Sequence, residues 1–119
     1  MIVLGIDPGT LRMGYGVVAE GSRLESVDHG VIALPSGMSL EQRLYQLHTH
    51  MLNLIAIFRP EAVAVEAPFV GRGERSFPGS SLAIGQAQAV VFIGAASQGI
   101  SLFKYAPAQV KLAVADYGA

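Results

Sequence analysis

The distribution of apolar and polar positions along the first part of the chain predicts three consecutive strands. Residues 1–7 are almost wholly apolar and end at an Asp-Pro-Gly turn sequence in residues 7–9. Residues 15–20 and 24–34 have the composition of two more strands, joined by a polar turn at residues 20–23. Because the connections are short, these strands are expected to form an antiparallel meander.

A long amphipathic helix is predicted to follow the meander. Ser39 and Gln42 form a capping box, in which the serine accepts a hydrogen bond from a free backbone N–H group at the start of the helix. Arg59-Pro60 is expected to end the helix. Between Ser39 and Arg59, apolar residues recur at steps of three and four and so form one apolar face of the helix. They are Leu40, Leu44, Leu47, Met51, Leu54, Ile55 and Phe58.

The rest of the chain alternates between strands and helices. The expected elements are an apolar strand at 62–65, a Gly-, Ser- and Arg-rich loop at 71–81, a helix at 82–98 capped by Gly99, a strand at 100–105, and a helix from Pro107 to Gly118. This order predicts an α/β fold with one mixed five-stranded sheet, in which an antiparallel meander is joined to parallel strands and helices flank the sheet. With the first strand in the centre, this is the ribonuclease-H-like arrangement, in a single domain over residues 1–119.

The composition fits one folded domain. Of 119 residues, 51% are hydrophobic and 14% charged, which excludes a disordered chain. No apolar run reaches the ~18 residues of a membrane span, and the N-terminus lacks the basic start of a signal sequence. The absence of cysteine excludes disulfides and thiolate metal sites and fits a reducing cytoplasm. A net charge of -1 neither indicates nor excludes a nucleic-acid partner.

Two acidic residues close strands that are expected to be neighbours in the sheet. Asp7 ends the first strand and Glu66 follows the fourth, and the carboxyl ends of parallel strands meet at one edge. Turn chemistry explains Asp7 alone, and solvent exposure explains Glu66 alone, about as well as a functional role does. The pair favours a Mg²⁺ site, because hard cations prefer carboxylate oxygens. Hydrolysis with two metal ions needs further ligands, so the pair is half of such a site.

An ordered set of motifs resembles the RuvC-type Holliday-junction resolvases. The matching segments are Gly5-Ile6-Asp7-Pro8-Gly9-Thr10, Gly14-Tyr15-Gly16, Val65-Glu66 with Phe69, Gly85-Gln86-Ala87, and Tyr105-Ala106-Pro107-Ala108-Gln109-Val110-Lys111. The resemblance implies a crossover junction endodeoxyribonuclease that resolves four-way junctions by paired symmetric nicks in DNA recombination and repair. It also implies two Mg²⁺ ions per complete site, with Mn²⁺ as a plausible substitute.

The resemblance assigns roles to individual residues. Asp7 and Glu66 would be catalytic metal ligands, Phe69 would stack at the junction centre, and Lys111 would contact the scissile region. Without the resemblance, Phe69 could be ordinary packing and Lys111 a surface charge. An aromatic residue in a loop beside the acids is nevertheless well placed to stack on an unpaired base.

Three arginines are further candidates for DNA binding. Arg72 and Arg75 lie in the expected Gly/Ser loop, and Arg12 follows the first turn. Each could be a solvated charge, but arginines beside a cutting site suit phosphate contacts.

The resemblance also implies partners and a missing part. It implies a homodimer to which the small-residue helix at 82–98 contributes, and the branch-migration complex RuvA-RuvB. The family completes its site with an acidic pair on a later helix, whereas this sequence ends at Ala119, and Asp116 does not match either acid. We therefore expect this form to lack the C-terminal helical part and to be incomplete for catalysis.

Three alternative functions remain open at this stage. A non-catalytic junction-binding fragment would share the fold and lack the acidic pair. A nucleotide-binding module of the actin/sugar-kinase type shares the Gly-Ile-Asp-Pro-Gly-Thr opening but needs a second lobe, for which the chain is too short. The small nucleases of ribosomal-RNA maturation share the opening Asp-Gly pattern, while the segments around Glu66 and Lys111 favour the RuvC type.

Overall fold

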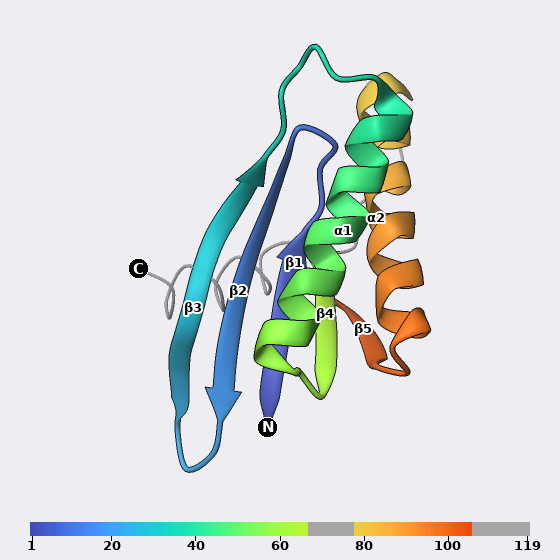
Figure 1. Ribbon diagram of the computed structural model, residues 1–119. Helices are drawn as coiled ribbons and strands as arrows, with labels where there is room; N and C mark the ends of the chain where they lie inside the picture. The colour runs from blue at the N-terminus through green and yellow to red at the C-terminus, as the bar shows by residue number, and fades with distance from the viewer. Residues whose placement is uncertain (67–77, 106–119) are drawn as a thin grey trace.

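The computed structural model describes residues 1–66 and 78–105 (Figure 1). Along the chain, its elements are β1 (Ile2–Asp7), β2 (Arg12–Glu20), β3 (Leu24–Ala33), α1 (Leu40–Phe58), β4 (Ala62–Glu66), α2 (Pro78–Ser97) and β5 (Ser101–Tyr105). The expected order of strands and helices is therefore confirmed over the described residues.

The strands form one mixed sheet in the order β3-β2-β1-β4-β5. β1 pairs antiparallel with β2, and β2 pairs antiparallel with β3, which makes the meander. β1 also pairs parallel with β4, and β4 pairs parallel with β5. β1 thus lies in the centre, between the antiparallel and the parallel halves, as the sequence predicts (Figure 1).

Both described helices pack on the same face of the sheet (Figure 1). Side chains alternate between the two faces of a strand, so Leu4 and Ile6 of β1 point into the core while Asp7 points to the other face. The core cluster joins the sheet to both helices: Leu4, Ile6, Met13, Val17, Ile32, Val63 and Val65 meet Leu47, Met51, Leu54 and Ile55 of α1, and Ala87, Val90, Val91 and Ala95 of α2.

The limits of α1 agree with the sequence signals. Ser39 is the N-cap and its hydroxyl oxygen accepts a hydrogen bond from the backbone N–H of Gln42 at 3.3 Å. Arg59 is the C-cap, in the left-handed conformation, and its N–H donates to the carbonyl oxygen of Ile55 at 2.8 Å. A short-range cap at each end therefore sets the length of this helix.

Two boundaries differ from the sequence-based expectation by three residues or more. α2 begins at Pro78 and not at residue 82, so the last part of the expected loop at 71–81 is helical. Proline suits the first turn of a helix, which explains a start there despite the glycine and serines that follow. β2 begins at Arg12 and not at residue 15, because Met13 pairs with Ile32 of β3 and both are buried.

The two helices approach each other closely at Gly94. A Cβ atom at this position would lie 2.8 Å from Cγ of Met51, so only glycine fits without a shift of the methionine side chain. At the end of α2, Gly99 adopts a φ of 68°, as expected for a C-terminal glycine cap.

None of the described helices is long and apolar enough to cross a membrane. The helix expected from Pro107 to Gly118 lies outside the described residues.

Candidate functional site

Asp7 and Glu66 end neighbouring strands of the sheet. In the parallel pair β1 and β4, Ile6 is in register with Val65, and each acid is the next residue along its strand. Neighbouring strands run about 4.8 Å apart, so the two backbone positions lie side by side at the carboxyl edge. Glu66 is also in register with Tyr105 of β5. The two acids thus lie 59 residues apart in sequence but at adjacent positions in the sheet.

The Asp7 carboxylate is available as a metal ligand. Asp7 is half-buried and points away from the apolar core. It makes no hydrogen bond or ion pair with any residue in the described ranges, where the ion pairs are Met1–Glu61 and Arg23–Glu25. Its two oxygens are hard donors of the kind that Mg²⁺ prefers. The donor chemistry at Asp7 therefore fits a divalent cation. Among the described residues, no three or more His, Cys, Asp or Glu side chains cluster so that they could hold a metal ion by themselves.

A tight turn positions Asp7. A Cβ atom at Gly9 would lie 2.2 Å from the carbonyl oxygen of Arg12, so the path from β1 to β2 leaves no room for a side chain there. The backbone N–H of Leu34 donates to the carbonyl oxygen of Leu11 at 2.9 Å and ties this turn to the end of β3. Arg12 is exposed at the start of β2, and the alternation along the strand places it on the same sheet face as Gly14, the residue paired with Asp7.

Gly14, which the sequence motifs do not single out as a site residue, is a neighbour of Asp7 in the sheet. The two residues are in register in the β1–β2 pair, and a Cβ atom at Gly14 would lie 3.6 Å from Cβ of Asp7. Six residues separate this pair in the chain, and two of them, Arg12 and Met13, pair with β3 and not with β1, so the length of the connection did not reveal this neighbour.

Tyr15 and Asp28 form a polar pair on the other face of the sheet. The Tyr15 hydroxyl donates to Oδ2 of Asp28 at 3.4 Å, and the tyrosine ring packs over Gly30. Burial raises the pKa of Tyr15, and the negative charge of Asp28 and the hydrogen bond to it raise this pKa further. Since Tyr15 follows Gly14 in β2, it points to the core side. The pair therefore joins β2 to β3 and lies apart from the Asp7 edge.

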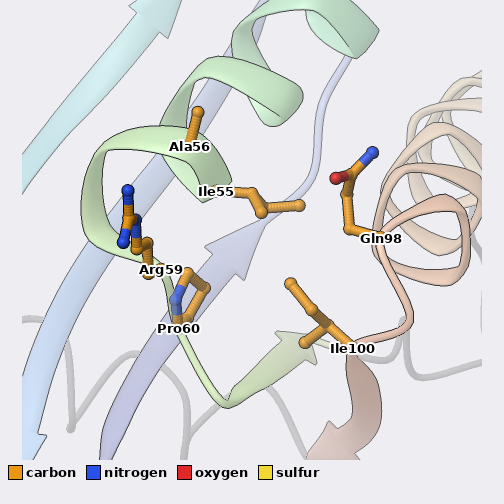
Figure 2. A pocket seen from close by; sticks show the side chains of 6 residues that line it. All are labelled: Ile55, Ala56, Arg59, Pro60, Gln98 and Ile100. Atoms are coloured by element: carbon orange, nitrogen blue, oxygen red, sulfur yellow. The ribbon is translucent and has the colours of Figure 1, made fainter.

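An open pocket lies at the opposite edge of the sheet. It has a volume of about 420 Å³ and is lined by Ile55, Ala56, Arg59, Pro60, Gln98 and Ile100. Figure 2 shows these side chains around the end of α1 and the segment that leads into β5. Because Pro60 and Ile100 precede β4 and β5, the pocket is at the amino ends of the parallel strands, away from Asp7 and Glu66. This hollow is therefore separate from the paired acids.

The protein family of this chain follows from its similarity to known proteins. The family model described as "Crossover junction endodeoxyribonuclease RuvC" matches residues 3–119. The chain belongs to the RuvC family. Two curated relatives with that name come from Rubrobacter xylanophilus, 44% identical over 118 residues, and Heliobacterium modesticaldum, 40% identical over 119 residues. The alignments cover 98% and 99% of this chain, but only 64% and 71% of the relatives' own lengths.

Solved structures similar to this chain include a RuvC protein and another Holliday junction resolvase. The structure of Thermus thermophilus RuvC in complex with a Holliday junction substrate superposes with a TM-score of 0.81 and 32% identity, covering 97% of this chain and 72% of that one. The yeast mitochondrial Holliday junction resolvase Ydc2 has a TM-score of 0.64 at 18% identity, covering 97% of this chain and 52% of that one, which is a likeness of fold alone. The predicted ribonuclease-H-like sheet is thereby confirmed.

Four of the predicted site residues of this RuvC-family chain lie outside the described residues. They are Phe69, Arg72, Arg75 and Lys111. Their expected DNA contacts stay predictions. Of the predicted set, the structure describes Asp7 and Arg12 with their side chains and Glu66 by its position in β4, all at the same edge of the sheet.

Proposed function

We propose that this chain carries the catalytic core of a divalent-metal-dependent endonuclease that resolves Holliday junctions by paired symmetric nicks in DNA recombination and repair. The observation that carries the proposal is the side-by-side placement of Asp7 and Glu66 at one edge of the sheet, in a chain that matches the RuvC family over residues 3–119. The same match favours this function over a nucleotide-binding module or a nuclease of ribosomal-RNA maturation. Absence of cysteine supports the cytoplasm as the proposed location.

In this proposal, Asp7 and Glu66 hold the divalent ions, with Mg²⁺ as the natural metal and Mn²⁺ as a substitute. When bound, two such ions lower the pKa of the attacking water and neutralise charge on the phosphate. Asp7 presents its carboxylate oxygens to the metal from the end of β1, and the tight turn at Gly9 holds this strand end in place. Arg12, exposed on the same face, is proposed to contact a DNA phosphate beside the cut. The two acids supply four carboxylate oxygens, so we propose that further ligands come from a C-terminal helical part.

Binding of branched DNA is the direct test of the substrate. We expect this chain to bind a four-way junction more tightly than a linear duplex in gel-shift titrations. Affinity for both should fall steeply between two salt concentrations, because contacts by Arg72, Arg75 and Lys111 release counterions. Phe69→Ala should reduce the preference for the junction more than the overall affinity, since stacking reads shape and phosphate contacts do not.

The control for this test is Tyr45→Ala, which removes an aromatic side chain that is 67% exposed on α1. This variant should keep the junction preference of the unaltered chain. Equal affinity of the unaltered chain for junction and linear duplex would contradict junction recognition and leave generic phosphate binding.

We further propose that the chain forms a homodimer through the outer face of α2. This helix contains no charged residue anywhere along its length. Leu82 is 64% and Ile93 is 60% exposed on it, with Ala89 exposed between them. An uncharged, apolar outer face is typical of a covered surface. A second copy is the proposed occupant, because two symmetric nicks need two active sites.

The dimer is tested with two matched substitutions. Ile93→Glu on α2 should shift the chain to the monomer in size-exclusion chromatography with light scattering, since it places a charge in the proposed interface. Ile57→Glu on α1, where the side chain is 69% exposed, should leave the dimer intact. A monomeric unaltered chain, or equal behaviour of the two variants, would rule out this interface.

By the family resemblance, RuvA and RuvB are proposed as further partners.

A further inference from the structure

Gly14 lies opposite Asp7, and its backbone does not require a glycine. Among the described glycines, Gly99 alone has a φ in the left-handed region. The nearest described atom to a Cβ at Gly14 would be Cβ of Asp7, at 3.6 Å. That distance is an ordinary van der Waals contact. Both the conformation and the described surroundings of residue 14 would therefore accept a side chain.

Two other glycines of the meander, Gly9 and Gly30, differ from Gly14 in this respect. At Gly9, a Cβ would meet the carbonyl oxygen of Arg12 at 2.2 Å, and at Gly30 it would meet Oη of Tyr15 at 2.9 Å. Steric exclusion explains both of these glycines. It does not explain Gly14 within the described part of the fold.

A glycine inside a strand also has a cost. It loses more conformational freedom on folding than any other residue, and it offers no side chain to the neighbouring strands. β-Branched residues are favoured at such positions. Gly14 is the third residue of β2 and pairs with β1 on one side and β3 on the other. The strand would therefore be more stable with a larger residue here.

We infer that Gly14 determines metal access to Asp7, by keeping open a space beside the carboxylate on the β2 side. This inference rests on the proposed metal role of Asp7. Divalent ions such as Mg²⁺ keep several water ligands, so the species that reaches Asp7 is wider than the bare ion. The next residue in the same row, Val31 of β3, is 60% exposed and lies one strand further away. An empty position 14 thus leaves room for the hydrated ion, or for a phosphate oxygen that shares it.

The test compares Gly14→Val with Gly14→Ala in the full chain. Mn²⁺ is the probe, and free Mn²⁺ is followed by electron paramagnetic resonance during titration. We expect Gly14→Val to weaken Mn²⁺ binding roughly tenfold or more, because its branched carbons occupy the space beside the carboxylate. Gly14→Ala should change the affinity little, since its Cβ makes only the 3.6 Å contact. The thermal midpoint of Gly14→Val without metal should equal or exceed that of the unaltered chain.

Two outcomes would overturn the inference about Gly14 itself. Unchanged Mn²⁺ affinity in Gly14→Val would show that the space is not used. A lowered thermal midpoint together with weak Mn²⁺ binding in both variants would show that the fold needs the glycine. Asp7→Asn separates these from failure of the proposed metal site. If that variant binds Mn²⁺ as well as the unaltered chain, the metal role of Asp7 fails and the inference falls with it.

Discussion

Asp7→Asn is expected to lower the rate of junction cleavage by at least roughly a hundredfold, with no loss of stability. The substitution keeps the size of the side chain and removes the charge that is proposed to hold the metal. Because Asp7 is half-buried and has no ionic or hydrogen-bonding partner among the described residues, removing its charge breaks no described contact. The measurement is the rate of paired nicking of a four-way junction at saturating Mg²⁺, together with the thermal midpoint. The protein is this chain extended by the corresponding C-terminal segment of the Rubrobacter xylanophilus relative.

Asp28→Asn is the matched control. Asp28 is also a half-buried acid of the meander, but it accepts a hydrogen bond from Tyr15 on the other side of the sheet. This variant should keep the nicking rate, and it should lower the pKa of Tyr15, because a negative charge that raises this pKa is removed. Cleavage by Asp7→Asn at the rate of the unaltered protein would contradict the metal role. An equal loss in both variants would indicate a general defect of the meander.

The second large expected effect is that the extended chain cleaves junctions at least roughly a hundredfold faster than the chain of 119 residues. The two proposed ligands, Asp7 and Glu66, would supply four oxygens, and two octahedral ions would otherwise depend on water and phosphate. Ions held so loosely are poorly positioned, and a misplacement of about 1 Å can cost on the order of a hundredfold in rate. Both forms are compared in the same junction-cleavage assay with saturating Mg²⁺ or Mn²⁺.

The outcome of this comparison separates three possibilities. Robust paired nicking by the 119-residue chain, abolished by Asp7→Asn, would contradict the incomplete site, and Asp116→Asn would then test Asp116 as a third ligand. No nicking by either form would favour a non-catalytic junction-binding protein. The salt dependence of junction binding, measured on the same samples, would show whether DNA contacts survive in that case.

Local signals in the sequence predicted the elements whose limits depend on local chemistry. The Ser39 cap and the Arg59-Pro60 stop define α1, because caps and prolines act within a few residues of the backbone groups that they satisfy or remove. The all-apolar stretch at 62–65 predicted β4, because a strand covered on both faces needs apolar side chains throughout. Together with the meander, these elements were enough to predict the sheet and to place Asp7 and Glu66 at one edge.

Tertiary structure decided what depends on contacts between distant segments. The start of β2 at Arg12 follows from burial of Met13 beside Ile32, a contact that no local signal contains. Opposition of Gly14 and Asp7 likewise depends on strand register, which the core selects by burying alternate residues of β1 and β2. A one-residue slip would turn Asp7 toward the core. The sequence by itself therefore determined which acids meet, whereas only the packed sheet decided which residue stands beside Asp7 and how much space it leaves.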